Sequence, residues 1–331
     1  MLLSVPAFAE RLREACAEKN AAFRIVYHIN PDGDCIGSGY ALAMILRALG
    51  AKAAVTGRDP VPAQFREMTD HLPNDNLPDG ALYIGVDGKD RSRTGQTLQE
   101  MPYAFWIDHH GSPETQAPSE LVLPERSACG EIVLELAEAL SVPVTPQMAE
   151  LLYTALVTDT NCFRTVSTNA VSFRSAARLT EYGADAYGIA RRYAMVKSPA
   201  RLAIERTVFG KMHMLCGGRL VSSEILLSDL ADAGIAEQNA PEMQNINGLL
   251  EVIGSAEMTV MVREYPEGTP EGRTRFSVKT TSAKLSARDI AEQMGNGSGH
   301  PQAAGGFSDL TPCEARAKLE ALCAKALEAV E

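Results

Sequence analysis

With 331 residues, the chain is too long for one compact core of ordinary size, so its length predicts two domains. Hydrophobic residues make up 45% of the chain and charged residues 22%, a balance typical of folded proteins that excludes an intrinsically disordered chain. The net charge of -11 disfavours binding to long duplex nucleic acid, and the sequence shows no strong basic stripe that would offset it.

Targeting and redox features of the sequence favour a cytoplasmic setting. The first twenty residues predict an amphipathic helix and not a secretory signal, because charged residues begin at Glu10. No segment approaches the roughly 20 apolar residues that span a bilayer, so a membrane protein is not expected. The seven cysteines are odd in number and include no C-x-x-C pair, which favours reduced thiols over disulfides or a structural zinc site.

The first half of the chain alternates apolar runs of strand length with helical patterns. FRIVYHIN (23–30) predicts a strand, a Gly/Asp loop follows it, and GSGYALAMILRALG (37–50) predicts a helix. Three more runs predict strands, namely AKAAVTG (51–57), ALYIGVDG (81–88) and YAFWIDHH (103–110). Continuous apolar runs of this kind are typical of a parallel sheet covered by helices. From SACGE (127–131) onward the pattern becomes helical.

The second half of the chain predicts a smaller domain of different architecture. We expect a first domain over 1–185, a connecting helical linker over 186–212 and a second domain over 213–331. Strands are predicted at 219–227, 256–265 and 273–281, and helices at 286–294 and 311–330. The turn-rich PEGTPEG between the last two strands predicts a hairpin. The expected fold class is α/β, with a parallel sheet and flanking helices in the N-terminal domain and a mixed sheet in the C-terminal domain.

Acidic and histidine side chains gather where the predicted strands of the first domain end. They are, in chain order, His28, Asp32, Asp34, Asp87, Asp108, His109, His110 and Asp159. Because the carboxyl ends of parallel strands share one edge of a sheet, these side chains are expected to converge. Four clustered aspartates are costly without cations, and two divalent ions would balance the charges of Asp32, Asp34, Asp87 and Asp159.

The types of these side chains indicate which ions and which chemistry to expect. Carboxylate oxygens with a few imidazoles suit manganese or magnesium better than zinc. Two such ions about 3.5 to 4 Å apart form a clamp for displacement at phosphorus, in which the ions activate a water. One histidine of the pair would then bind an ion, while its neighbour His110 faces the phosphate. Asp108 could accept a hydrogen bond from an ion-binding imidazole and orient it.

Simpler explanations exist for single residues of this set. An aspartate after a strand is usually a helix cap or a turn former, so Asp34 or Asp159 alone would carry little weight. Cys35 and Cys162 adjoin the predicted ligands, but we expect them to be packing residues.

Four motifs in this part of the chain resemble the successive motifs of the DHH phosphoesterases. They are HINPDGDCIGS (28–38), VDGKD (86–90), IDHHG (107–111) and VTDTNCF (157–163), and their order and spacing match that family as well. SACGE (127–131) and the stretch at 163–185 extend the likeness over residues 20–185. The C-terminal stretch at 277–306 is similar to the DHH-associated domain, whose signature is GGGH followed by AAG. Together they resemble the short two-domain branch of the family, the NrnA type.

The resemblance implies an activity and a role for each residue. Members of this branch degrade very short RNAs and linear dinucleotides and dephosphorylate 3'-phosphoadenosine 5'-phosphate (pAp). His28 and Asp32 would bind one manganese ion. Asp34, His109 and Asp159 would bind the other, and Asp87 would bind both. His110 would contact the scissile phosphate, and Asp108 would support His109. His300, with Gly299 and Ser298, would hold the far end of the substrate across a cleft between the domains.

Two departures from the family pattern bear on substrate binding. The loop GNGSGH (295–300) carries Asn296 and Ser298 among the usual glycines, so a close backbone approach to a phosphate is less assured. Lys279 stands where the family typically has an arginine and offers a point charge in place of a bidentate fork; Arg263, Arg273 and Arg275 are nearby alternatives.

Other functions stay open on the sequence alone. Within the enzyme class they are a cyclic-dinucleotide phosphodiesterase and a single-strand exonuclease. A family of inorganic pyrophosphatases shares the first domain, but its basic C-terminal signature is not visible in this chain. Outside the enzyme class, the alternative is a catalytically weak nucleotide-binding sensor. We expect short single-stranded RNA, dinucleotides or a nucleotide bisphosphate as substrate, neither duplex DNA nor a membrane as partner, and two Mn²⁺ ions with Mg²⁺ as the alternative. A homodimer is neither required nor excluded.

Overall fold

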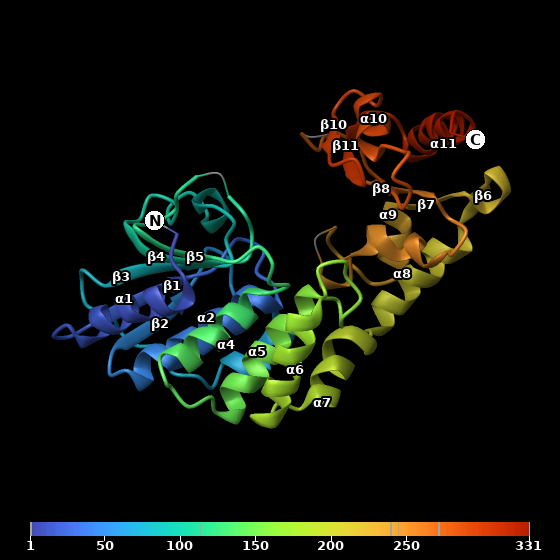
Figure 1. Ribbon diagram of the computed structural model, residues 1–331. Coiled ribbons are helices and arrows are strands. Elements are labelled where there is room, and N and C mark those ends of the chain that lie inside the picture. Colours follow the sequence, from blue (N-terminus) through green and yellow to red (C-terminus); the bar gives the residue numbers. More distant parts are fainter. Residues whose placement is uncertain (1, 113, 239, 244, 271, 331) are drawn as a thin grey trace. The chain divides into compact units, whose positions relative to one another are not determined.

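The computed structural model describes residues 2–112, 114–238, 240–243, 245–270 and 272–330 (Figure 1). The chain divides into two compact units, one that ends at Val196 and one that begins at Lys197. The segment 186–212, predicted as a helical linker, contains the helices α7 (Ala186–Ala190) and α8 (Pro199–Gly210) and the π-helical turn η2 (Arg191–Met195). The boundary between the two units therefore falls inside that segment.

The first unit is built on a five-stranded parallel sheet with the order β2-β1-β3-β4-β5. Its strands are β1 (Ala22–Val26), β2 (Lys52–Thr56), β3 (Leu82–Val86), β4 (Tyr103–Asp108) and β5 (Ser119–Val122). Its helices are α1 (Val5–Ala17), α2 (Gly33–Ala48), α3 (Ala63–Thr69), α4 (Cys129–Ala139), α5 (Pro146–Asp159) and α6 (Ala170–Glu181), with the 3₁₀ turn η1 (Arg91–Thr94). The parallel sheet and its helices confirm the predicted fold class, although β5 was not predicted. The strand order reverses between β1 and β3, which is where ligands bind in open sheets of this kind.

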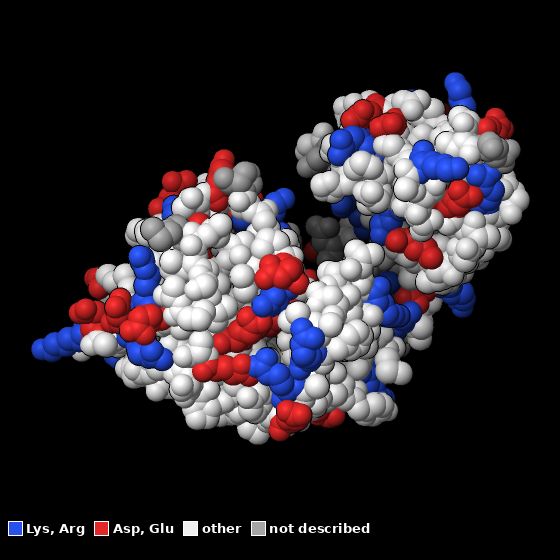
Figure 2. Space-filling model, viewed as in Figure 1, with Lys and Arg blue, Asp and Glu red and all other residues white. Residues whose placement is uncertain are grey.

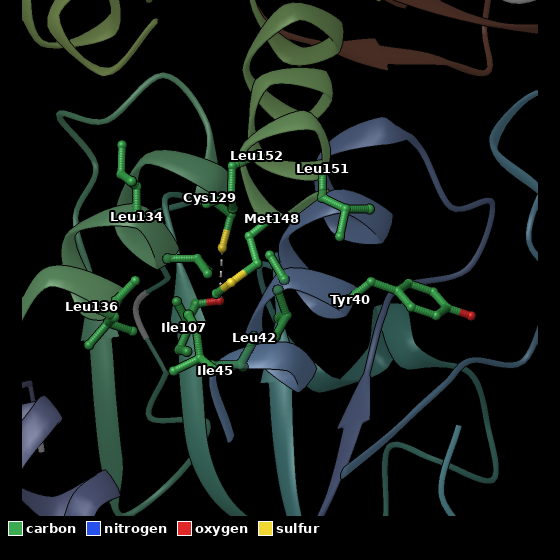
Figure 3. Close-up of a cluster of buried hydrophobic side chains, with 14 of the residues drawn as sticks. Tyr40, Leu42, Ile45, Ile107, Cys129, Leu134, Leu136, Met148, Leu151 and Leu152 are labelled. Atoms are coloured by element: carbon green, nitrogen blue, oxygen red, sulfur yellow. Dashed lines mark hydrogen bonds between the residues drawn. The ribbon is translucent and has the colours of Figure 1, made fainter. Parts of the chain in front are cut away.

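The largest apolar core of the first unit lies between the sheet and the helices α1, α2, α4 and α5. Figure 3 shows part of it, with Leu42 and Ile45 of α2 and Met148 of α5 gathered near Ile107 of β4. The Cys129 thiol of α4 donates a hydrogen bond of 3.6 Å to the Ile107 carbonyl. Burial of this side of the strands accounts for the apolar runs in the sequence.

Two glycines let α2 and α5 approach each other closely. A side chain at Gly37 would place its Cβ 2.3 Å from the Leu151 carbonyl oxygen, and one at Gly33 would lie 2.4 Å from the Thr158 hydroxyl. Because Gly33 begins α2 and Thr158 lies near the end of α5, this contact brings the start of one helix to the end of the other. The site described below lies at that junction.

The second unit carries a six-stranded mixed sheet with the order β10-β11-β9-β8-β7-β6. Its strands are β6 (His213–Leu215), β7 (Leu220–Ile225), β8 (Met258–Glu264), β9 (Thr274–Thr280), β10 (Gly297–Gly299) and β11 (Ala303–Ser308). Its other helices are α9 (Leu227–Asp232), α10 (Ala287–Glu292) and α11 (Pro312–Glu328), with the 3₁₀ turns η3 (Cys216–Gly218), η4 (Pro241–Met243) and η5 (Ile246–Val252). Only β7 and β8 pair in parallel. The mixed sheet and the predicted hairpin of β8 and β9 are confirmed; of its PEGTPEG turn, Glu271 lies outside the described residues.

The two faces of this second sheet have different surroundings. One face packs against α10 and α11 through side chains such as Val260, Val262, Phe276 and Val278. On the opposite face, Val221, Ile225 and Met261 pack with residues of α8, α9 and η5 over β7 and β8. On β9, Arg275 is exposed on this face, whereas Ser277 and Lys279 are half-buried.

The surface shows both signs of charge. On the face viewed in Figure 2, Lys and Arg side chains are interspersed with Asp and Glu, and no continuous basic stripe is visible there. In the described part of the chain, no helix has the length and apolar character that crossing a membrane requires.

Candidate metal centre

The predicted site residues of the first unit lie at the carboxyl ends of β1, β3 and β4 and at the adjoining ends of α2 and α5. His28 follows β1, and its Nδ1 pairs with the Ile29 carbonyl at 2.8 Å. If Nδ1 is the donor of that bond, the Nε2 lone pair is free. Nε2 lies 3.6 Å from an Asp32 carboxylate oxygen and 3.8 Å from one of Asp87.

The start of α2 holds two aspartates in different ways. Asp32 is the N-cap and accepts hydrogen bonds of 3.1 Å from the backbone N–H groups of Asp34 and Cys35. Asp34 already belongs to the helix, which begins at Gly33 and not at Gly37 as the sequence pattern suggested. The predicted Gly/Asp loop is therefore in part a helix start, where backbone amides donate hydrogen bonds to Asp32.

Asp34 is fully buried and tied to α4. Its carboxylate accepts hydrogen bonds from the backbone N–H groups of Cys129 at 2.6 Å and Gly130 at 2.9 Å, and from the Ser38 hydroxyl at 2.9 Å. These two amides lie at the N-terminus of α4, where the helix dipole favours an anion. The SACGE motif (127–131) does not reveal this role in the sequence, since backbone amide donors leave no side-chain signal.

Asp87 lies between the two halves of the cluster. It directly follows β3 with φ of 58°, a left-handed conformation that aspartate tolerates better than most residues. One of its carboxylate oxygens lies 3.8 Å from His28 Nε2, and the other lies 3.3 Å from His109 Nε2. The two oxygens of one carboxylate thus face the two halves of the cluster.

His109 faces the remaining aspartates. Its Nε2 lies 3.8 Å from Asp34 and 3.6 Å from Asp159, the last residue of α5. Its Nδ1 pairs with the Arg126 carbonyl at 3.2 Å. With Nδ1 as the donor, the Nε2 lone pair points into the cluster.

Asp108 supports His110 and not His109, so that part of the prediction is wrong. Asp108 accepts hydrogen bonds from the His110 backbone N–H at 2.8 Å and pairs with His110 Nδ1 at 2.9 Å. The Trp106 indole and the Lys89 backbone N–H also donate to Asp108, at 3.2 Å and 2.5 Å. Successive side chains at the end of an extended strand point to opposite sides, so an aspartate reaches the second residue after it more readily than the next.

Three overlapping groups of side chains bring possible metal ligands together. Within each group, one ligand atom per residue lies within 4.8 Å of the others. The first group contains His28, Asp32, Cys35 and Asp87, and the second contains Asp87, Asp108, His109 and His110. The third contains Asp34, His109 and Asp159. The unpredicted member is Cys35, whose thiol donates to the Asp32 carbonyl at 3.6 Å. Burial raises the pKa of this thiol well above its usual value, so the thiol is neutral in the metal-free protein.

Two buried atoms at the centre have no hydrogen-bond partner among the described residues. They are Asp87 Oδ1 and His109 Nε2, which face each other at 3.3 Å. Buried polar atoms without partners are rare in folded proteins, and an ion is one of the groups that satisfies them. An oxygen and a nitrogen donor that are both available fit a divalent cation.

The ionisation of the cluster agrees with a cation site. Burial, together with the nearby Asp34, raises the pKa of Asp87 well above its usual value, and burial and Asp34 raise that of Asp159 to about 7. Burial opposes the charged form of His109, but the nearby carboxylates of Asp87, Asp34 and Asp159 raise its pKa to about 10. Without an ion, these groups therefore retain protons that a metal would displace.

The four predicted substrate-binding residues lie in the second unit. Ser298 and Gly299 belong to β10, His300 follows it, and the His300 backbone N–H donates to the Ala303 carbonyl at 2.9 Å. Because Ala303 pairs with Lys279 in the sheet, Lys279 and His300 lie at the same end of β11. Lys279 forms an ion pair with Glu251.

The altered glycine loop is a short strand of an antiparallel pair and not a free loop. Gly299 has φ of 144°, and a Cβ there would lie 2.6 Å from the Ala303 carbonyl oxygen; at Gly297 it would lie 2.1 Å from the Ala291 carbonyl oxygen. Glycine is retained at these two positions, which require it, whereas Ser298 is exposed and pairs with Gly305. The departure at Ser298 therefore leaves the backbone path intact.

Comparisons with known proteins agree with this architecture. Residues 22–156 match the family described as "DHH family, N-terminal domain". The chain is 29% identical over 305 residues to the "Bifunctional oligoribonuclease and PAP phosphatase NrnA" of Thermus thermophilus, covering 91% of this chain and 89% of that one. It is 23% identical over 259 residues to a "Probable manganese-dependent inorganic pyrophosphatase" of Streptococcus thermophilus, covering 74% and 83%. Among solved structures, an exopolyphosphatase-related protein from Bacteroides fragilis shares the fold, with a TM-score of 0.80, 21% identity and coverage of 97% and 96%.

Proposed function

We propose that this chain is a member of the DHH family and a manganese-dependent phosphoesterase that hydrolyses short linear oligonucleotides and dinucleotides, and pAp. The similarity to the Thermus thermophilus NrnA protein supports the substrate class, because it extends over both units. The similarity to a probable manganese-dependent pyrophosphatase supports manganese, and the oxygen-rich donors of the cluster suit that ion.

One observation carries the proposal, namely the position of Asp87. Its two carboxylate oxygens face His28 on one side and His109 on the other, and the oxygen that faces His109 has no hydrogen-bond partner among the described residues. A carboxylate in that position suits a bridge between two cations. His28 and Asp32 would hold one ion, and Asp34, His109 and Asp159 the other. When bound, two such ions supply a reactive water at neutral pH and offset the charge of the phosphoryl group.

The protein's own residues contribute orientation and contact. The pairing of Nδ1 with Asp108 fixes the ring of His110, whose side chain is 38% exposed. The opposite nitrogen, Nε2, is then available to contact a phosphate oxygen of the substrate. Asp108 acts through this histidine and does not touch the substrate.

The second unit would hold the far end of the substrate through Ser298, Gly299, His300 and Lys279. A grip on a terminal phosphate selects short substrates, because it measures the distance from that phosphate to the scissile bond. We also propose a cytoplasmic setting, which the free thiols of all seven cysteines favour.

The test is the release of phosphate and nucleosides from a panel of substrates, with manganese and with chelator. The panel holds pAp, the linear dinucleotide pGpG, a five-nucleotide RNA, a cyclic dinucleotide and inorganic pyrophosphate. We expect turnover of the short linear substrates and of pAp. Chelator and the His109→Ala substitution should each abolish this turnover. The control His213→Ala, at a histidine of the second unit, should retain it. Turnover confined to the cyclic dinucleotide or to pyrophosphate would replace the proposed substrate, and binding without turnover would indicate a sensor.

A further inference from the structure

Arg263, a buried arginine of the second unit, has no acidic partner among the described residues. Arg263 of β8 is only 5% exposed, and its Nε has no hydrogen-bond partner among the described residues. Among the described residues, its hydrogen-bond partner is the Tyr265 hydroxyl, which Nη2 contacts at a long distance of 3.5 Å. Buried charges are normally paired, because their desolvation is costly.

A second arginine lies directly opposite the first. Arg275 of β9 is exposed and pairs with Arg263 in the antiparallel register of β8 and β9. Like charges directly opposite one another destabilise a sheet. Burial lowers the pKa of Arg263, Tyr265 counteracts this, and Arg275 lowers it further. Within the described part of the chain, no carboxylate is among the groups that shift this pKa.

Aromatic side chains flank the two guanidinium groups. Arg275 lies over the Phe307 ring at 5.8 Å, and Arg263 lies 5.9 Å from the ring centre of Tyr265. The rings of Tyr265 and Phe307 pack edge to face with their centres 5.1 Å apart. These contacts limit the movement of both arginines and provide a weak attraction, but they do not neutralise the charges.

The other cations considered for this face already have acidic partners. Lys279 pairs with Glu251, and Arg273 lies 3.8 Å from Glu264. Of these four cations, only Arg263 and Arg275 have no carboxylate partner among the described residues. An anion with several oxygens can accept hydrogen bonds from the N–H groups of two guanidinium side chains at once. A single carboxylate side chain has only two oxygens and does this less well.

We propose that Arg263 and Arg275 form a binding site for a phosphate group. The phosphate accepts hydrogen bonds from both guanidinium groups, including the Arg263 Nε, and removes their mutual repulsion. It belongs either to the nucleotide substrate, in which case this part of the inference rests on the proposed function, or to a separate phosphate compound. The experiment distinguishes these two sources.

The first part of the test uses inorganic phosphate as the probe and the full chain with chelator present, so that no metal contributes to phosphate binding. We expect calorimetric titration to show phosphate binding that Arg275→Gln weakens about tenfold or more, the loss expected for a charge-assisted bidentate contact. Arg263→Lys keeps the charge but not the fork and is expected to weaken binding as well. Arg206→Gln, at an exposed arginine of α8, is the matched control and should bind phosphate as the wild type does. Absence of phosphate binding in the wild type, or unchanged binding in Arg275→Gln, would overturn the proposal.

The second part measures turnover of pAp and pGpG with manganese. If the phosphate belongs to the substrate, Arg275→Gln raises KM and leaves kcat nearly unchanged, since Arg275 belongs to the second unit and is not one of the proposed metal ligands or of the residues that contact the scissile phosphate. If a separate phosphate compound binds, KM stays unchanged while the titration still shows the loss. A wild-type protein without turnover would refute the proposed function, and the phosphate titration would still decide the arginine site.

Discussion

The Asp108 carboxylate holds His110 twice, through the backbone N–H at 2.8 Å and through the ring Nδ1 at 2.9 Å. The Trp106 indole and the Lys89 backbone N–H hold Asp108 in turn. Asp108 is itself fully buried, whereas His110 is partly exposed. This chain of contacts links the sheet core to the one histidine of the pair that is open to a substrate.

Asp108→Asn is therefore expected to lower kcat by about 10- to 100-fold while manganese binding changes little, the size of effect seen when partners of active-site residues are removed. The amide keeps the shape but no longer carries the charge that favours His110 in one orientation. Measurement of kcat and of bound manganese in the same preparation checks this. Trp106→Phe, which removes only the indole donor, should have a smaller effect; a parallel loss of manganese would show that Asp108 serves the ions instead.

Asp87→Asn should abolish turnover without destabilising the metal-free protein. The asparagine tolerates the left-handed backbone at this position, and it removes a buried carboxylate whose pKa is raised by burial. We expect activity below detection and a melting temperature in chelator equal to or higher than that of the wild type. Full activity in this variant would contradict the bridging role, and a large loss of stability would show that Asp87 is structural.

Much of this centre could be predicted from the sequence, because histidines and aspartates at the ends of apolar runs must share one edge of a parallel sheet. The partners that orient them could not. The backbone amides of Cys129 and Gly130 donate to Asp34, and the backbone carbonyl of Arg126 pairs with His109. These partners could not be predicted because backbone groups are common to all residues and leave no signature in the sequence. The strand β5 was missed since SELV is short and half polar, and it is recognisable only from its pairing with β4.

Stabilisation by manganese is expected to grow with pH. The folded-state pKa of Asp159, about 7, and that of His109, about 10, both lie above the usual values of 3.8 and 6.5. The metal-free folded state thus binds these protons more tightly than the unfolded state does, and the stability they contribute is lost as pH rises through the two folded values. Manganese replaces the protons, so its increase in melting temperature should be larger at about pH 8 than at about pH 6. Equal increases at both values would show that ion binding displaces no protons here.

Gly37→Ala should destabilise the first unit, because its Cβ would lie 2.3 Å from the Leu151 carbonyl oxygen, a backbone atom that cannot move aside without shifting α5. Overpacking of this kind costs about 1–3 kcal/mol. Gly39→Ala, two residues along the same helix, is the matched control. Its Cβ would meet only Val55 and Ile25 at 3.5 Å and 3.6 Å, ordinary contacts, so the higher helix propensity of alanine should leave stability equal or improved. Chemical denaturation of both variants measures the difference; equal stability would mean that α2 and α5 have room to separate, and the close approach that brings Asp34 to Asp159 would then need another cause.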